Sequence, residues 1–204
     1  NINYIMDNLI YITPDGLPKD VCSEIINRFE RSDEKVKGMT TKGINEDMKK
    51  STELFISPKE EWKDIDDIIY KSMSKHIDIY AENFKVDNKP FWCPNGQDEG
   101  YNIKRYEPGD YYHWHVDHLV RHDGKEGSTR ILSFIWYLND MDDGGYTEFY
   151  TGQKVNPKAG QLLIFPSTWN YPHRGVTPVS GNKYIIVSFY SINTQTLEFL
   201  RYDK

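Results

Sequence analysis

The sequence predicts an α+β domain in which two N-terminal helices pack on one sheet of an antiparallel double-stranded β-helix, or jelly roll. Two observations predict this class. Apolar residues recur every three or four positions in parts of the first half, and short β-rich runs separated by Gly, Pro, Asn and Asp fill the second half. Strands of that length and spacing are typical of sandwiches and barrels. A chain of 204 residues is long enough for one such domain.

The first half supplies the expected helices. Residues Asn8–Thr13 alternate as a strand does, and Pro18 then suits the first turn of a helix that we expect to end near Glu30. A second, longer helix is predicted from Pro58 onwards. Its apolar stripe consists of Trp62, Ile65, Ile69, Met73, Ile77 and Tyr80. The stretch Arg31–Lys50 between the helices is polar and lacks an apolar period, which predicts a mobile loop.

The second half supplies the expected strands, after Pro90. We predict them at Tyr101–Tyr106, Tyr111–Asp117, Arg130–Leu138, Thr147–Tyr150, Gln161–Phe165 and Lys183–Tyr190. Within the single domain 1–204, residues 1–95 are then a helical support with a substrate-side loop, and residues 96–195 are the jelly-roll core.

Composition excludes several classes of function. A net charge of −6 provides no broad basic face for phosphate backbones, so we expect no nucleic-acid partner. The longest apolar runs are strand-sized, so no membrane-spanning segment is expected. Cys22 and Cys93 offer neither a disulfide framework nor a CxxC metal site, and the default for each is a small buried side chain. Together these features favour a cytoplasmic protein.

A candidate metal site lies in the predicted strand that contains His115 and Asp117. Side chains two residues apart in a strand face the same way, so this imidazole and this carboxylate are expected to project together. His173, from a distant strand, would complete a set of two histidines and one carboxylate. Such a set suits non-haem Fe(II) and leaves positions open for substrate and dioxygen. The His-x-Asp pattern alone arises often by chance.

The residues around this pattern resemble the prolyl 4-hydroxylases of the Fe(II)/2-oxoglutarate-dependent oxygenase superfamily. The similar features occur in order: Tyr106-Glu107-Pro108-Gly109, His115-x-Asp117, Arg130 before a Tyr137-Leu138-Asn139 strand, Gly144-Gly145-x-Thr147, His173, Pro178-Val179, Gly181 and Lys183. The resemblance covers about Tyr101–Tyr190, nearly half of the chain. The first hundred residues match only loosely.

The resemblance implies a role for each matching residue. His115, Asp117 and His173 align with the catalytic iron ligands, and Lys183 aligns with the base that pairs with the far carboxylate of 2-oxoglutarate through charge-assisted hydrogen bonds. Tyr106 matches a tyrosine near the cosubstrate, while Tyr137 and Thr147 match positions that reach its distal carboxylate. Arg130 and Tyr112 match substrate-facing positions. For the tyrosines and for Arg130, core packing or a surface ion pair is the alternative.

The chain also departs from the family pattern. Three further imidazoles lie nearby: strand alternation predicts that His113 points with His115, whereas His118 and His122 are expected to be solvated in a loop through Gly124 and Gly127. Phe189 stands where relatives commonly carry a tryptophan near the substrate. Residues 140–145 lack the spacing of a calcium loop and are expected to form a hairpin turn.

The resemblance implies hydroxylation of prolyl residues in a peptide or protein, with formation of succinate and CO2, an activity like that of procollagen-proline 4-dioxygenase. The implied cofactors and cosubstrates are Fe(II), 2-oxoglutarate and O2, with ascorbate as an optional addition. Asp117 favours hydroxylation over halogenation, because a halogenase would need a small residue there to free a halide site. The polar loop Arg31–Lys50 is a candidate lid over the substrate.

Two alternatives remain open. The same oxygenase chemistry could act on a free amino acid, another protein side chain or a nucleobase, although an arginine in place of Lys183 would be expected for nucleobase repair. A jelly-roll module that binds metal without turnover is the third reading. It predicts stable metal binding with no succinate formed.

Overall fold

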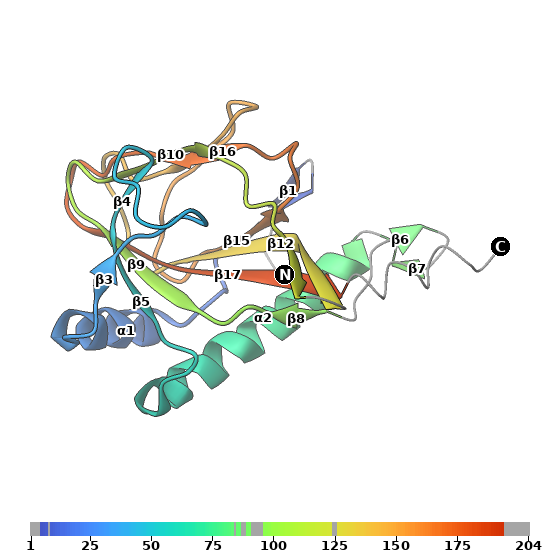
Figure 1. Cartoon of the computed structure of the whole chain (residues 1–204), viewed down its shortest axis with the longest axis horizontal. Helices are drawn as coiled ribbons and strands as arrows, with labels where there is room; N and C mark the ends of the chain where they lie inside the picture. Colours follow the sequence, from blue (N-terminus) through green and yellow to red (C-terminus); the bar gives the residue numbers. More distant parts are fainter. Residues whose placement is uncertain are drawn as a thin grey trace.

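The computed structural model of the protein has three layers, and it describes residues 5–7, 9–83, 85–86, 89–90, 96–123 and 126–193. A small sheet lies above a large sheet, and two helices lie beneath the large sheet (Figure 1). The sheets are antiparallel and face each other as in a jelly roll. The predicted fold class is confirmed.

The large sheet contains most of the long strands. Its order is β1 (Ile5–Asp7), β2 (Ile10–Thr13), β15 (Leu162–Pro166), β12 (Glu126–Tyr137), β17 (Lys183–Asn193), β9 (Asn102–Tyr106), β5 (Thr52–Phe55) and β3 (Val36–Lys37). In addition, β11 (Val120–Asp123) pairs with β12, and β8 (Gln97–Asp98) pairs with β17.

The small sheet faces the inner side of the large one. Its order is β14 (Lys154–Val155), β13 (Thr147–Phe149), β16 (His173–Gly175), β10 (Tyr111–His115) and β4 (Lys49–Lys50). A separate two-stranded ribbon is formed by β6 (Lys85–Val86) and β7 (Lys89–Pro90).

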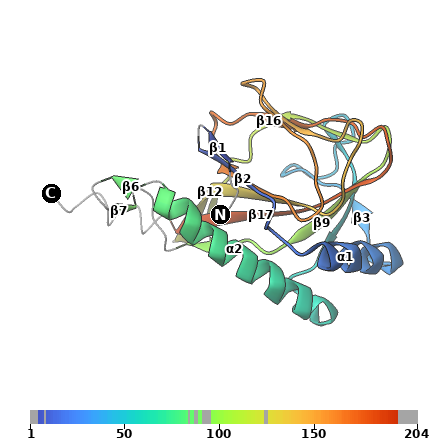
Figure 2. The same ribbon diagram turned by 180° about the vertical axis from the view of Figure 1, so that it is seen from behind.

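The two helices cover the outer face of the large sheet (Figure 2). They are α1 (Lys19–Arg31) and α2 (Lys63–Asn83), the latter preceded by a 3-10 turn at Glu60–Trp62. Their apolar stripes pack with Phe134 and Trp136 of β12 into one core, while the alternate residues Ile135 and Tyr137 belong to a second core between the sheets. Because of this alternation, the side chains on the inner face of the large sheet do not contact the helices and can line a binding site between the two sheets. Neither helix has the length and apolar character of a membrane span.

The expected elements agree with the observed ones, with three corrections. The stretch Arg31–Lys50 is not simply irregular, because it contains β3 and β4, which pair with β5 and β10. His122 lies in strand β11 rather than in a loop, since the β11–β12 hairpin is longer than expected. Residues 1–95 add strands to both sheets, so they are more than a helical support.

The two cysteines were expected to be buried. Cys22 is fully buried in α1, against the outer core. Cys93 lies outside the described residues.

Candidate metal centre and cosubstrate pocket

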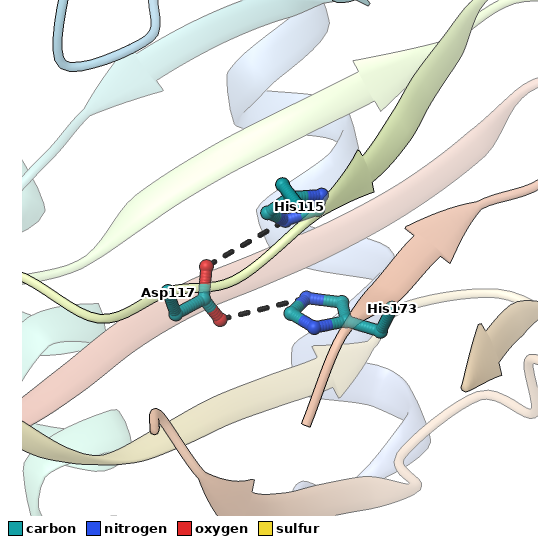
Figure 3. Close-up of side chains that lie close together, drawn as sticks. All are labelled: His115, Asp117 and His173. Atoms are coloured by element: carbon teal, nitrogen blue, oxygen red, sulfur yellow. Dashed lines mark ion pairs between the residues drawn. The ribbon is translucent and has the colours of Figure 1, made fainter. Parts of the chain in front are cut away.

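Three potential metal ligands converge where β10 and β16 meet (Figure 3). His115 ends β10, Asp117 follows two residues later, and His173 begins β16 directly opposite His115. Asp117 Oδ1 lies 3.6 Å from His115 Nε2, and Asp117 Oδ2 lies 3.5 Å from His173 Nε2. The ligand atoms of all three residues lie within 4.8 Å of one another. In the part of the chain that the structure describes, no other histidine, cysteine and carboxylate side chains form such a group.

Backbone carbonyl groups orient both imidazoles. His115 Nδ1 lies 2.8 Å from the carbonyl oxygen of His113, and His173 Nδ1 lies 3.1 Å from that of Tyr171. We assign the proton to Nδ1 in each ring, because a carbonyl oxygen can only accept. The lone pair of each Nε2 then faces the carboxylate, which is the arrangement that metal-binding histidines use.

The protonation states also suit a divalent cation. Burial, and then the neighbouring His173, lower the pKa of His115 to about 3, so this imidazole is neutral. Burial raises the pKa of Asp117, but the two imidazoles and a hydrogen bond from Ser133 outweigh it and hold the pKa of the carboxyl below its usual value. A neutral imidazole and an ionised carboxylate are ready to coordinate without losing a proton. These residues therefore fit an Fe(II) ion.

A β-bulge decides which residues of β10 face the site. The pairing register of β10 with β16 shifts between Tyr112 and His115. Consequently the Tyr112 ring stacks on the His115 ring at 3.5 Å between centroids, whereas His113 is exposed and lies against Tyr111. The expectation that His113 points with His115 is wrong, because the extra residue of a bulge breaks the strict alternation. The expectation that Asp117 lies in the strand is also wrong, since the strand ends at His115.

Lys183 stands at the bottom of the same cavity. It begins β17 opposite Tyr106 of β9, and its ammonium lies 5.5 Å from the Tyr106 ring centre and 5.8 Å from that of Tyr137. The Tyr137 and Thr147 hydroxyl groups lie 2.6 Å apart beside it. Lys183 is 2% exposed, and no carboxylate among the described residues pairs with it. Burial lowers the pKa of this amine to about 7. A dicarboxylate would give the lysine the counter-ion that it lacks.

Gly144 and Gly145 allow this arrangement. Both have positive φ, +69° and +67°, and a Cβ on Gly144 would meet the Thr177 carbonyl oxygen at 2.3 Å. A Cβ on Gly145 would approach Lys183 Cδ at 3.5 Å. The two glycines of the Gly-Gly-x-Thr sequence therefore form a turn in which a side chain would be strained or would clash. This turn leads into Thr147, which lies beside Lys183.

The cavity has a volume of about 600 Å³, and it contains the metal site, Lys183 and the expected substrate side. Arg130 and Tyr112 both line it. Arg130 donates hydrogen bonds of 2.7–3.0 Å to Glu99 and lies over the Phe189 ring at 3.5 Å. From the sequence, an ion pair was the alternative to a substrate-facing role for Arg130. The structure shows that Arg130 forms this ion pair with Glu99 and also lines the cavity. His118 also lines the cavity.

Several residues at the site were not anticipated from the sequence. Ser133 donates a hydrogen bond of 2.8 Å to Asp117 Oδ2, and Lys49, Glu53, Asn102 and Lys104 line the cavity. Strand alternation could have identified only Lys104 and Asn102. They precede Tyr106 by two and four residues on one strand, so their side chains share its face. Nothing local in the sequence identifies the others.

A jelly roll with a two-histidine, one-carboxylate site and a buried lysine on the adjoining sheet defines a class of non-haem iron oxygenase. Residues 101–191 match the sequence model of the 2OG-Fe(II) oxygenase superfamily. The resemblance expected from the sequence is confirmed. This match implies Fe(II), 2-oxoglutarate and O2, and the residues described above fit them.

The chain is also similar to prolyl hydroxylases. It is 34% identical to probable prolyl 4-hydroxylase 9 of Arabidopsis thaliana, over 37% of this chain and 32% of the relative. It is 27% identical to probable prolyl 4-hydroxylase 3 of the same plant, over 58% of this chain and 47% of the relative. The chain thus spans about a third to a half of the length of these curated relatives.

Solved structures show the same fold. The viral collagen prolyl hydroxylase of Paramecium bursaria Chlorella virus-1 superposes with a TM-score of 0.66 at 21% identity, covering 90% of this chain and 96% of that chain. A prolyl-4-hydroxylase of Pseudomonas putida gives a TM-score of 0.66 at 21% identity, covering 89% and 92%. These likenesses support the jelly-roll assignment.

Proposed function

We propose that the protein is an Fe(II)- and 2-oxoglutarate-dependent dioxygenase that hydroxylates prolyl residues in a peptide or protein, with formation of succinate and CO2. One observation carries the proposal: the His115, Asp117 and His173 side chains converge in a cavity that also holds the buried ammonium of Lys183, which pairs with no carboxylate of the described residues. The similarity to prolyl 4-hydroxylases supports the choice of substrate.

Residues of the chain would bind the iron and the cosubstrate as follows. His115, Asp117 and His173 would hold the iron on one side, leaving its other side open to the cavity. Lys183 would hold the far carboxylate of 2-oxoglutarate, with the paired hydroxyl groups of Tyr137 and Thr147 beside it. Once bound, Fe(II), 2-oxoglutarate and O2 supply the oxidising chemistry.

The substrate would enter beside Tyr112 and Phe189, whose rings line the cavity. Arg130 keeps this edge in place through Glu99 and through its contact with Phe189. Peptide binding is supported by a related structure: a Trichoplax adhaerens prolyl hydroxylase in complex with a hypoxia inducible factor peptide superposes with a TM-score of 0.66 at 20% identity.

The stretch 38–48 would act as a lid on this entrance. Met39, Thr40, Thr41, Lys42, Asn45 and Met48 all line the cavity. The short strands β3 and β4 flank this stretch, and the carbonyl oxygens of Met39, Glu46 and Met48 also accept hydrogen bonds from Lys49, Tyr111 and His113. A segment held by a few hydrogen bonds can move at modest cost when substrate binds.

Mass spectrometry of proline-containing peptides tests the proposed function. The peptides are incubated with the protein, Fe(II), 2-oxoglutarate and air, and both peptide oxidation and succinate are measured. We expect one oxygen to be added to proline, and we expect this gain to vanish in Asp117→Ala. Succinate without peptide oxidation would retain the oxygenase and exclude prolyl peptides as substrates. Bound iron without either product would favour a binding module.

A further inference from the structure

A second group of charged and polar side chains lines the cavity, apart from Lys183. It consists of Lys49 on β4, Glu53 on β5, and Asn102 and Lys104 on β9. Lys104 lies opposite Glu53 on one side and opposite Ile185 on the other. This group, here called the Lys104 cluster, therefore lies next to the cosubstrate position on the floor of the cavity.

Glu53 is fully engaged within the cluster. It forms an ion pair with Lys49, and it accepts hydrogen bonds of 2.9 Å from Ser51 Oγ and from Asn102 Nδ2. Lys49 also donates to the carbonyl oxygen of Met39 at 3.0 Å. Both side chains are buried, at 5% and 3% exposure. The direct ion-pair and hydrogen-bond partners of Glu53 are thus Lys49, Ser51 and Asn102, while Lys104 acts on it only through its charge.

Lys104 is left as the spare cation. It is 8% exposed, and no carboxylate or carbonyl oxygen within the described ranges is its hydrogen-bond or ion-pair partner. Its charge acts on Glu53 and on the candidate metal ligands His115 and Asp117, so it lies near both the pair and the metal site. Burial, and then the proximity of Lys104, lower the pKa of Lys49 to about 7. Two buried ammonium groups, those of Lys49 and Lys104, thus share the single carboxylate of Glu53, and a bound anion would balance the remaining positive charge.

The cosubstrate cannot supply this anion. 2-Oxoglutarate has two carboxylates, and in the proposed function one binds the iron while the other binds Lys183. Lys183 lies opposite Tyr106, whereas Lys104 lies two residues further along β9 towards Asn102, which is opposite Val187. Lys104 is therefore displaced towards the side of the cavity where Phe189 and Arg130 lie.

We propose that Lys104, which lies beside the Lys49–Glu53 pair, is a second carboxylate site, which binds an acidic group of the substrate close to the carbon that is hydroxylated. This inference rests on the proposed function and narrows its substrate class. The carboxylate could come from an Asp or Glu side chain flanking the target proline, or from the α-carboxylate of a terminal or free residue. Both present the same group to Lys104.

Matched substrates test the inference. One prolyl peptide is prepared with Asp or with Asn beside the target proline, on either side, together with a peptide ending in free-acid or amidated proline and with free L-proline. We expect the preferred acidic form to have at least a tenfold higher kcat/KM than its neutral partner, because an amide oxygen can still accept a hydrogen bond from Lys104 but loses the ion pair with it. The position that shows the preference identifies the source of the carboxylate. A ratio near one for every pair would overturn the inference.

Variants connect this preference to Lys104. We expect Lys104→Met to bring the acid-to-neutral ratio close to one, while Lys71→Met, an equal charge change on the exposed face of α2, keeps it. Glu53→Gln keeps hydrogen-bonding capacity but removes the negative charge, so the ratio should rise. Opposite shifts cannot both arise from general damage to the fold. An unchanged ratio in Lys104→Met would refute the role of this residue.

Anaerobic binding separates this inference from the proposed function. With Fe(II) and 2-oxoglutarate but no O2, titration of the acidic and neutral peptides reports affinity without turnover. A preference for acidic peptides that is lost in Lys104→Met, with no oxidation in air, would support the carboxylate site and contradict prolyl hydroxylation. Oxidation in air without any acidic preference would support the enzyme and contradict the carboxylate site.

Discussion

Ser133 donates a hydrogen bond of 2.8 Å to Asp117 Oδ2, which holds the carboxylate between the two imidazoles. Ser133 is itself hydrogen-bonded to Ser167 at 2.7 Å. We expect Ser133→Ala to weaken metal binding about 10- to 100-fold, the usual effect of removing a group that orients a ligand. Titration of the apoprotein with Fe(II) or Mn(II) measures this loss. Ser167→Ala, one bond further away, should have a smaller effect, and an unchanged affinity in Ser133→Ala would contradict this role.

Lys183 should make stability depend on pH. Burial lowers its pKa from 10.5 to about 7, so between these values the unfolded chain holds a proton that the folded chain has lost. Stability contributed by this residue therefore rises with pH across that window, by at most about 1.4 kcal/mol per pH unit. Urea denaturation at pH 7.5 and 9, without 2-oxoglutarate, should show a smaller rise in Lys183→Met than in the original chain or in Lys71→Met. Equal rises in all three proteins would show that Lys183 keeps its proton when buried.

At the scale of elements, the sequence predicts the helices and strands that depend on a local pattern of apolar residues. The apolar stripes of α1 and α2 and the six main strands were expected close to their observed positions. The bulge in β10 could not be predicted, because it depends on pairing with β16, some sixty residues away. The short strands β3 and β4 could not be predicted either, because their polar residues form strands only by pairing with β5 and β10.

The proposed lid makes its own prediction. Lys42 is exposed in the middle of the lid, and Lys37 is exposed at the end of β3 just before it, so trypsin should cut there. Fe(II), 2-oxoglutarate and a peptide substrate together should slow cleavage at these sites, because closure orders the segment. Mass spectrometry of timed digests measures the rates, with cleavage after Lys158, outside the cavity, as the internal control. Equal rates with and without ligands would refute a lid.

At the scale of the molecule, the two faces of the large sheet have separate tasks. The outer face packs on the helices and supplies stability, while the inner face carries Lys183, Tyr106 and Lys104. The metal site could be predicted because its residues carry a recognisable pattern within 101–191. The Lys104 cluster could not, because Lys49 and Glu53 come from the first half and meet Lys104 only in the folded chain. The cytoplasmic location expected from composition stays a prediction.

The most direct test of the central claim is turnover under ¹⁸O₂, with mass spectrometry of both products. A 2-oxoglutarate-dependent dioxygenase divides the two atoms of O2 between its products. We therefore predict one ¹⁸O atom in succinate and one in the hydroxyl group of the prolyl peptide, with neither product formed by Asp117→Ala. Succinate free of ¹⁸O, or peptide oxidation that persists without 2-oxoglutarate, would contradict the account.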